Sequence, residues 1–425
     1  MGIGEEMYGW TEDLFPFDRS ITGSGTRKTL RYLQNLLPDL EIHAVESGTR
    51  AFDWEVPEEW HIADAYIADE SGKRVVDWND HNLHVVGYSE PVDRWMELSE
   101  LDDHLYSLPD QPDAIPYVTS YYERRWGFCL RHRTRENLER GRYRAVIDSE
   151  FKQGVLNYGE LVLPGEEDEE VFLSTYVCHP SMANNELSGP VVATALGRWL
   201  ASLEDRRYTY RIIFVPETIG SIVYLSQNIS HLKDHVIAGF NLTCLGDERC
   251  YSYVPSREGD TLSDRVARHV LRHTDPNYKE YSFLDRGSDE RQYCAPGVDL
   301  PVATIMRSKF GEYPEYHTSL DDLSLVSPEG LKGGYKALRR CIEVIETNYN
   351  LRAKTLGEPN MGKRGLYPTT STKGKKGKVK TMMDIIAFSD GRSLLEISHK
   401  IGKCVQDIIP IVKKLCRRDV VDIEN

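Results

Sequence analysis

The chain has 425 residues, enough for two or three domains and at least one large buried core, and its formal net charge of −15 argues against a protein that coats nucleic acid. No stretch approaches the roughly 18 consecutive apolar residues of a membrane span, and the acidic start lacks the basic-then-apolar form of a secretory signal. The eight cysteines are scattered without a Cys-x-x-Cys pair, as in proteins with reduced thiols, so we expect a cytoplasmic protein with no membrane partner.

The first part of the chain predicts a helical entry followed by a small β-rich insertion. Residues 29–37 have helical spacing, and Pro38 ends that pattern. From residue 40 onward short apolar runs and polar turns alternate, which is typical of strands and a β-hairpin. The strand candidates there are residues 62–68, 74–78 and 82–88. We interpret residues 40–114 as a small β-rich inserted domain.

Strands and helices alternate in the long middle of the chain. The strand candidates are residues 143–147, 160–163, 171–177, 208–215, 236–245 and 300–306. The helix candidates are residues 191–203, 221–232, 262–272 and 328–349. Because long helices connect apolar strands, the pattern predicts an α/β fold with a mixed, mainly parallel sheet and helices on both faces. We assign residues 1–39 and 115–352 to this domain.

The C-terminal part predicts a separate module behind a linker. Residues 353–380 are rich in Gly, Lys, Thr and Pro and are expected to be a linker without a core. Residues 381–425 regain helical periodicity and end in a β-rich run, as in a winged helix. Its candidate recognition helix, residues 406–415, carries only Lys413 and Lys414, which predicts few phosphate contacts. We therefore expect binding of a protein partner or of a second copy, rather than of nucleic acid.

The most informative motif lies at residues 175–189. His179 ends an apolar strand, Glu186 follows in a polar loop, and Ser188 and Gly189 open a helix. Ligands gather at the carboxyl ends of strands in α/β sheets, and a histidine with a carboxylate suits a metal. The alternative is a solvated loop whose histidine caps the strand, because one histidine and one glutamate fall short of a complete site.

Two further motifs place polar side chains at the same edge of the sheet. Glu217 follows the strand at 208–215, where it could serve catalysis or simply cap the next helix. His317 lies among aromatic residues, and Asp321 or Asp322 could accept a hydrogen bond from its second ring nitrogen, as partners of metal-bound histidines do. The alternative for His317 is a buried histidine that only makes hydrogen bonds.

A charged loop precedes the strand predicted at 300–306. Its charge density is unusual, although a solvated loop would also explain it. Together with the three strand-end motifs, it favours recognition of a charged substrate group, since arginine binds carboxylates in pairs of hydrogen bonds and acidic groups bind an ammonium. The candidate substrate-binding residues are Asp285, Arg286, Asp289 and Arg291.

Taken in order, these four motifs resemble the zinc aminopeptidases of the transferrin-receptor and glutaminyl-cyclase superfamily. Within it the chain is similar to bacterial aminopeptidase-like proteins with a small inserted domain and a C-terminal winged helix. The resemblance implies an α/β zinc-peptidase core. His179 falls on the first metal-ligand histidine, and Glu217 falls in the region that supplies the acidic base and a ligand. The segment from His317 to Asp321 matches the final His-Thr-x-x-Asp ligand motif.

The chain also departs from that family at carboxylate positions. Asn185 precedes Glu186 where the family has a metal-bridging Asp followed by Asn, and Thr243 stands where a further Asp is expected. The family's Glu-Glu pair is reduced to Glu217. Two carboxylates that hold a second zinc are thus absent or moved, although Asp247 could substitute for one.

The resemblance implies one zinc ion held by His179, Glu186 and His317, with Glu217 as the base that deprotonates a zinc-bound water. A two-zinc alternative would add Glu217 and Asp247 as ligands. We expect a metallo-aminopeptidase or a related amidohydrolase that acts on a peptide or aminoacyl-amide of a dedicated pathway. Two alternatives remain: a catalytically silent ligand- or partner-binding protein, because of the lost carboxylates, and a nucleic-acid regulator, because of the winged helix and the lysines at 373–380.

Overall fold

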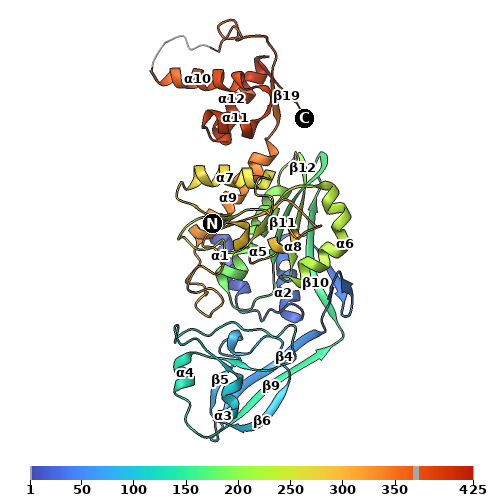
Figure 1. The fold of residues 1–425 in the computed structure, drawn as a ribbon, viewed down its shortest axis with the longest axis vertical. Coiled ribbons are helices and arrows are strands. Elements are labelled where there is room, and N and C mark those ends of the chain that lie inside the picture. The colour runs from blue at the N-terminus through green and yellow to red at the C-terminus, as the bar shows by residue number, and fades with distance from the viewer. Residues whose placement is uncertain (1, 367–372, 425) are drawn as a thin grey trace. The chain divides into compact units, whose positions relative to one another are not determined.

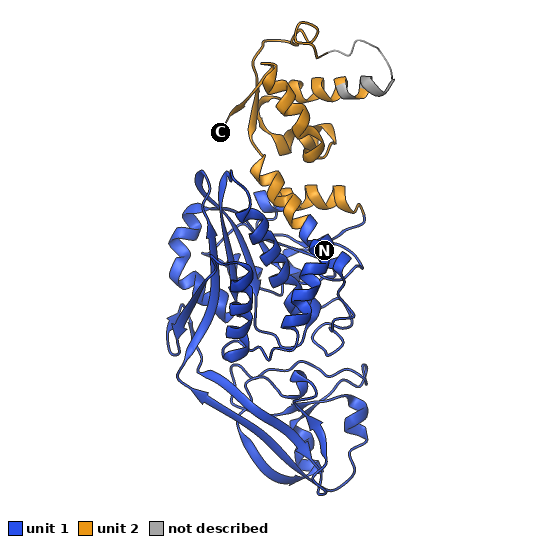
Figure 2. Cartoon of the chain, turned by 180° about the vertical axis from the view of Figure 1, so that it is seen from behind, with its two compact units in different colours: residues 1–264, 277–336 blue, residues 265–276, 337–425 orange. Residues whose placement is uncertain are grey.

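A computed structural model describes residues 2–366 and 373–424 (Figure 1). The chain forms two compact units (Figure 2). The first contains residues 1–264 and 277–336, and the second contains residues 265–276 and 337–425. Residues 367–372 of the predicted linker lie outside the described residues.

The first unit is built on an eight-stranded mixed sheet with the strand order β1-β10-β12-β11-β13-β16-β14-β15. Strand β11 pairs in parallel with β12 and β13, and β13 with β16, whereas β1, β10 and β12 pair antiparallel at one edge. This confirms the predicted α/β class. The strands are β1 (Glu41–Glu46), β10 (Val155–Leu163), β11 (Glu167–Tyr176), β12 (Tyr208–Val215), β13 (Val236–Leu242), β14 (Ser252–Val254), β15 (Lys279–Glu280) and β16 (Val302–Met306).

Helices cover both faces of this sheet. Successive residues of a strand point to opposite faces, and in β12 Ile212 approaches Gly197 of α5, while Ile213 belongs to an apolar cluster with Val223 of α6. Figure 1 shows α5 and α6 on opposite sides of the central strands. The helices of the first unit are α1 (Ile3–Leu14), α2 (Ser24–Leu36), α5 (Ser188–Ala201), α6 (Ile219–His235) and α8 (Glu290–Tyr293). Two further helices, α7 (Leu262–Thr274) and α9 (Pro328–Glu346), begin in the first unit and continue into residues of the second.

The start of α5 packs against the sheet without room for a side chain. A Cβ atom at Gly189 would lie 2.4 Å from the carbonyl oxygen of Leu242 and 2.4 Å from Oγ1 of Thr175. A single turn of π-helix (Ala183–Leu187) precedes it, a form that often occurs at functional sites. The close contact at Gly189 therefore anchors the turn that carries Glu186 at the ends of β11 and β13.

A second, antiparallel sheet in the first unit has the order β5-β4-β9-β6. The predicted hairpin is confirmed as β4 and β5. Residues 82–88 form no strand but begin with a 3-10 helix (Asn82–His84). The four strands are β4 (Glu59–Ala68), β5 (Arg74–Asp77), β6 (Val92–Glu97) and β9 (Arg142–Lys152). Two separate two-stranded pairs, β2 (Arg50–Ala51) with β3 (Trp54–Glu55) and β7 (Leu105–Tyr106) with β8 (Phe128–Cys129), and the short helices α3 (Leu98–Leu101) and α4 (His132–Glu136) complete this region.

The position of β9 differs from the prediction. We expected residues 143–147 in the central sheet, but β9 pairs with β4 from Glu59↔Lys152 to Ala68↔Arg144. Conversely β1, which lies inside the predicted insertion, belongs to the central sheet. Alternating apolar residues fit either sheet, so the pattern alone could not assign these strands.

The second unit contains a three-stranded antiparallel sheet, β18-β17-β19, and short helices, as in a winged helix. Part of the predicted linker is structured: Ala353 pairs with Val421, Met361 and Leu366 are buried, and a helix begins at Lys373. The elements are β17 (Asn350–Ala353), α10 (Lys373–Ala387), β18 (Asp390–Ser393), α11 (Leu394–Ile401), α12 (Val405–Arg417) and β19 (Val421–Glu424).

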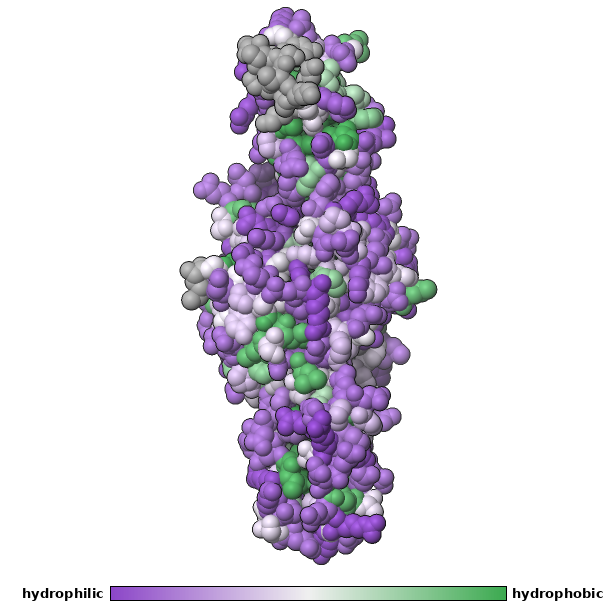
Figure 3. Space-filling view, turned by 90° about the vertical axis from the view of Figure 1, so that its left-hand side faces the viewer, coloured by the Kyte–Doolittle hydropathy of each residue, from purple (hydrophilic) through white to green (hydrophobic). Residues whose placement is uncertain are grey.

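The surface is largely polar on the face shown in Figure 3, where hydrophobic side chains gather in small groups. Among the residues that the structure describes, none of the helices has the length and apolar character needed to cross a membrane.

Candidate functional site

A pocket of about 380 Å³ lies where β11 and β12 end. Cys178 and His179 follow β11, Glu217 follows β12, and all three line the pocket together with His317. Residues at the carboxyl ends of parallel strands were expected to meet at this edge. The structure thus brings together four of the predicted site residues, because Arg291 also lines the pocket, and their positions are up to 138 residues apart in the chain.

His179 presents its two ring nitrogens to two different carboxylates. Nδ1 lies 2.9 Å from Oε2 of Glu186, and Nε2 lies 3.5 Å from Oε2 of Glu217. Burial lowers the pKa of His179, but the hydrogen bond and charge of Glu186 outweigh it, so the pKa is raised. When Nδ1 donates to Glu186, the lone pair of Nε2 faces the pocket and Glu217.

Glu186 is paired with a buried arginine that the sequence reasoning missed. Nε of Arg19 lies 3.6 Å from Oε1 of Glu186, and both side chains are fully buried. Arg19 also donates to the carbonyl oxygens of His179 (2.8 Å) and Leu14 (2.6 Å). Burial lowers the pKa of Arg19, while the charge of Glu186 opposes this shift. The expected metal ligand Glu186 is therefore held on the Nδ1 side of His179, away from Glu217, by a balancing charge.

His317 has a buried Nε2 atom with no hydrogen-bond partner. Its ring stacks on Tyr316 at 3.9 Å and lies 5.5 Å from the ring of His179, with Tyr117 edge-on to both at 5.2 Å. Burial, with the positive charge of His179, lowers the pKa of His317 to about 3, so the ring is neutral at pH 7. A neutral imidazole nitrogen without a partner can accept a metal ion.

Asp321 does not make the contact predicted for it. Instead of holding His317, its carboxylate accepts hydrogen bonds from the backbone N–H groups of Asn184 (2.6 Å) and Asn185 (2.9 Å) and from the Tyr313 hydroxyl (2.8 Å). Asp321 therefore stabilises the π-helical turn that carries Glu186.

The backbone at Thr218, directly after Glu217, has a strained conformation that helps to fix the position of the Glu217 side chain. Thr218 has φ 66° and ψ −73°, and the N–H of Ile219 donates to the carbonyl of Glu217 at 2.8 Å, which is a γ-turn of the rare positive-φ form. Asp289 accepts from the Thr218 N–H at 2.8 Å, and Ser288 donates to Oε1 of Glu217 at 3.0 Å. Burial raises the pKa of Glu217, although the charge of His179 opposes this.

The predicted substrate-binding residues separate into three groups. Arg291 lines the pocket, with Nη2 2.7 Å from Oγ1 of Thr218. Asp289 is fully buried behind the γ-turn, and burial followed by the charge of Glu217 raises its pKa to about 8. Asp285 caps a 3-10 helix (Phe283–Asp285), and Arg286 lies over the Phe283 ring. Both are exposed and do not line this pocket, so their predicted role has no support from the geometry.

Asn185 and Thr243, which are neutral, stand where carboxylates are expected from the resemblance to zinc aminopeptidases. Asn185 donates to the Tyr176 hydroxyl at 2.8 Å, and Thr243 donates to the Asn185 carbonyl at 3.0 Å. Asp247 is saturated by donors, namely the Asn184 side chain and the N–H and hydroxyl of Ser308. The Asp247 carboxylate is therefore engaged in hydrogen bonds with these donors and makes no contact with His179.

One group of potential metal ligands with mutually close donor atoms occurs among the described residues. Atoms of Cys178, His179 and Glu186 lie within 4.8 Å of one another, and all three residues are buried. Burial raises the pKa of the Cys178 thiol well above its usual range. The thiol is therefore protonated, and Glu186 already faces Arg19, so this trio suits a cation less well than the Nε2 side of His179 does.

Strand β3 and the loop that holds residues 117–122 contribute walls that sequence reasoning missed. Trp54, Tyr117, Tyr121 and Tyr122 all line the pocket. The Tyr-Tyr pair at 121 and 122 was visible in the sequence, but no local pattern indicated that it returns to the strand ends. Arg19 gave no signal either, since its partner Glu186 lies far along the chain.

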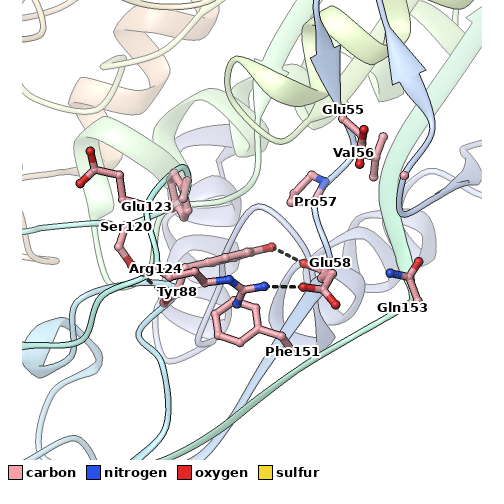
Figure 4. Close-up of a pocket in the computed structure, with 12 residues that line it drawn as sticks. Glu55, Val56, Pro57, Glu58, Tyr88, Ser120, Glu123, Arg124, Phe151 and Gln153 are labelled. Atoms are coloured by element: carbon pink, nitrogen blue, oxygen red, sulfur yellow. Dashed lines mark hydrogen bonds and ion pairs between the residues drawn. The ribbon is translucent and has the colours of Figure 1, made fainter.

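Figure 4 shows a second pocket, of about 260 Å³. Its arginine, Arg124, makes an ion pair with Glu58 and lies 3.5 Å from the centre of the Phe151 ring. The Tyr88 hydroxyl donates to the Glu58 carbonyl at 3.3 Å. Tyr121 lines both pockets. Because Arg124 is already paired, this pocket gives weaker grounds for a ligand than the one at the strand ends.

Comparison with known families identifies the chain at the level of family. Residues 8–348 match the model of a family described as "Domain of unknown function (DUF4910)". The chain belongs to this family. Residues 349–423 match a winged helix-turn-helix model, which confirms the predicted C-terminal module.

Relatives of this DUF4910 protein carry aminopeptidase-like names. It is 43% identical, over 94% of its length and 92% of the relative's, to the Clostridium acetobutylicum protein called "Putative polysaccharide biosynthesis protein with aminopeptidase-like domain". A crystal structure of a "putative peptidase" from the same organism matches 99% of this chain and 96% of that one, with 41% identity and a TM-score of 0.93. The zinc aminopeptidase of Bacillus subtilis matches 80% and 94%, with 12% identity and a TM-score of 0.58. The first unit therefore has the aminopeptidase fold.

Proposed function

We propose that the protein is a zinc-dependent hydrolase of the aminopeptidase or amidohydrolase type that cleaves an amide bond. One observation carries this proposal: His179, Glu217 and His317 line one pocket at the strand ends, where Nε2 of His179 lies 3.5 Å from the Glu217 carboxylate and Nε2 of His317 has no hydrogen-bond partner. Neutral imidazoles and a carboxylate form a common zinc-ligand set that leaves a position open for a reactant.

The residues present fit a single zinc ion. Two ligands of a tetrahedral zinc with bonds near 2.0–2.1 Å are about 3.4 Å apart, and His179 Nε2 lies 3.5 Å from Glu217 Oε2. The His179 and His317 ring centres, 5.5 Å apart, also allow both Nε2 atoms to bind one ion. We assign the ligand roles to His179, His317 and Glu217, and we assign Glu186 the role of orienting His179 through Nδ1.

The same geometry favours one ion over two. Asn185 and Thr243 are neutral and bonded to each other and to Tyr176, and Asp247 is engaged by Asn184 and Ser308. A second dication would have to displace these hydrogen bonds in a buried region without gaining a free carboxylate.

Zinc, when bound, would polarise the substrate carbonyl and lower the pKa of a water molecule. The protein supplies the positioning: Ser288 holds Oε1 of Glu217, so that Oε2 faces His179 as a ligand rather than as the base expected from the sequence. Tyr117, edge-on to both histidines, fixes their rings and limits solvent around them. Arg291 lies at the pocket where a charged substrate group can bind.

The substrate is proposed to belong to a dedicated pathway rather than to general protein turnover. The name of the 43% identical relative, which points to polysaccharide biosynthesis, supports this. The eight cysteines are all free, which supports a cytoplasmic location.

Glu217→Gln tests the proposal. We expect a weaker affinity for zinc and a fall in hydrolysis with it, because the variant replaces a proposed carboxylate ligand by a neutral amide. Zinc content is measured by mass spectrometry after dialysis, and turnover on a panel of aminoacyl-amides and N-acyl amines. Glu123→Gln, an exposed carboxylate outside this pocket, is the matched control. Wild-type turnover by Glu217→Gln would remove the residue from the mechanism.

A catalytically silent binding protein is the second candidate. Two features favour it. Asn185 and Thr243 are neutral where the aminopeptidases that the sequence resembles have acidic groups, and the charge of Glu186 is balanced by Arg19. The panel above separates the two: zinc-dependent binding of substrates without turnover by the wild type would support a binding role.

We infer that the winged helix binds protein rather than DNA. Its helix α12 carries Lys413, Lys414 and Arg417, too few cations for tight binding to a phosphate backbone. A chain shortened to end near Asn350 is expected to keep zinc but to change its association state in light scattering. Sub-micromolar, salt-sensitive binding of duplex DNA by the full chain would contradict this inference.

A further inference from the structure

Arg291 is a cation with free donors at the edge of the pocket. Its side chain is exposed and lines the pocket, and its one hydrogen bond within the described residues runs from Nη2 to the Thr218 hydroxyl. No carboxylate of the described residues forms an ion pair with it. The rest of the guanidinium is therefore available for a carboxylate, which arginine binds with two parallel hydrogen bonds.

The pocket offers no comparable place for a free ammonium group. Glu217 is the one carboxylate among the described residues that line it. Its Oε1 already accepts a hydrogen bond from Ser288, and its Oε2 faces His179 Nε2. A substrate ammonium would thus lie near Arg291 and a histidine, and it would have no free carboxylate oxygen to pair with. This arrangement is unfavourable.

Aromatic side chains form another part of the pocket wall. Trp54 lies edge-on to Tyr122 with ring centres 5.4 Å apart, and Tyr121 lies 6.2 Å from Tyr122. Tyr122 is 66% exposed, so a large apolar surface is open at the pocket. Such surfaces bind rings with a gain in buried area. The volume of about 380 Å³ equals that of roughly a dozen liquid water molecules, enough for one acylated amino acid.

We propose that this pocket takes an N-acyl amino acid with a ring-bearing side chain, whose carboxylate binds Arg291 and whose ring packs on Trp54 and Tyr122. The assignment of such a compound as a substrate rests on the proposed hydrolase function. In the reaction, water adds to the acyl carbon and the C–N bond breaks, which yields a carboxylic acid and the free amino acid, with the proton of water moving to the leaving amine. The enzyme would thus act as an aminoacylase rather than release an N-terminal residue.

Three matched probes test the binding part of this proposal. N-acetyl-tryptophan carries the carboxylate, N-acetyl-tryptophanamide lacks it, and tryptophanamide has a free ammonium instead of the acyl group. Calorimetric titration of the full chain, with and without zinc, is expected to show the acid binding about 10- to 100-fold more tightly than either amide, as for charge-assisted hydrogen bonds.

Arg291→Gln should remove most of this preference and leave the affinity for N-acetyl-tryptophanamide nearly unchanged. Arg286→Gln is the control, because this exposed arginine of the same loop lies outside the pocket. An unchanged preference in Arg291→Gln, an equal loss in Arg286→Gln, or tightest binding of tryptophanamide would overturn the proposal. If the acid binds through Arg291 but is never hydrolysed, the binding proposal stands and the hydrolase function fails. If amides are hydrolysed without any role of Arg291, the hydrolase function stands and this proposal fails.

Discussion

Replacement of either His179 or His317 by alanine is expected to abolish tight zinc binding. Each variant removes one of three proposed ligands, and the loss should exceed the 10- to 100-fold effect that is typical of losing an outer hydrogen-bond partner of a ligand. Competition with a fluorescent zinc chelator measures the affinity. Turnover on any verified substrate should fall in parallel, because the same ion would activate the carbonyl.

His132→Ala is a suitable control for these variants. His132 lies in α4, and its Nδ1 is 3.0 Å from the Ser107 hydroxyl rather than in the pocket. It should bind zinc as the wild type does. Zinc retained at full affinity by both His179→Ala and His317→Ala would refute the metal site. Loss in only His179→Ala would instead point to the group formed by Cys178, His179 and Glu186.

The second large effect concerns stability. Glu186→Gln leaves Arg19 as an unpaired charge in a fully buried site. Breaking a buried ion pair by removing one partner costs about 3–5 kcal/mol, so the urea midpoint of the first unit should fall strongly in tryptophan fluorescence. The double variant Arg19→Met/Glu186→Gln should be more stable than the sum of the single effects predicts, because it leaves no unpaired charge.

An exposed pair provides the matched comparison. Arg94 and Glu100 lie 2.8 Å apart with side chains 50% and 54% exposed, and Glu100→Gln should cost at most about 1 kcal/mol. If Glu186→Gln is no more destabilising than Glu100→Gln, the buried pair does not exist in solution. The zinc affinity of Glu186→Gln tests the role of Glu186 separately. A fall of about 10- to 100-fold fits a residue that orients His179, whereas complete loss of zinc binding would show that Glu186 is a ligand, as the sequence predicted.

Local sequence determined the order of strands and helices around the central sheet and the positions of His179 and Glu217 at strand ends. Each β-branched apolar run followed by a polar loop and a small-residue turn folds as a strand, a loop and a helix, because this pattern depends on neighbours within a few residues. His179 and Glu217 follow such strands, and parallel strands end at one edge, so their meeting in one pocket could be predicted.

Tertiary structure alone decided which groups face one another at that edge. Arg19 meets Glu186, and Asp321 meets the backbone of Asn184, across more than 100 residues of chain. Nothing in the spacing around Glu186 indicates a buried cation. A buried charge must find its partner wherever the packed chain brings one, and this depends on long-range packing rather than on local periodicity. Long-range packing likewise decided which sheet β9 joined, because its alternating apolar residues fit either sheet.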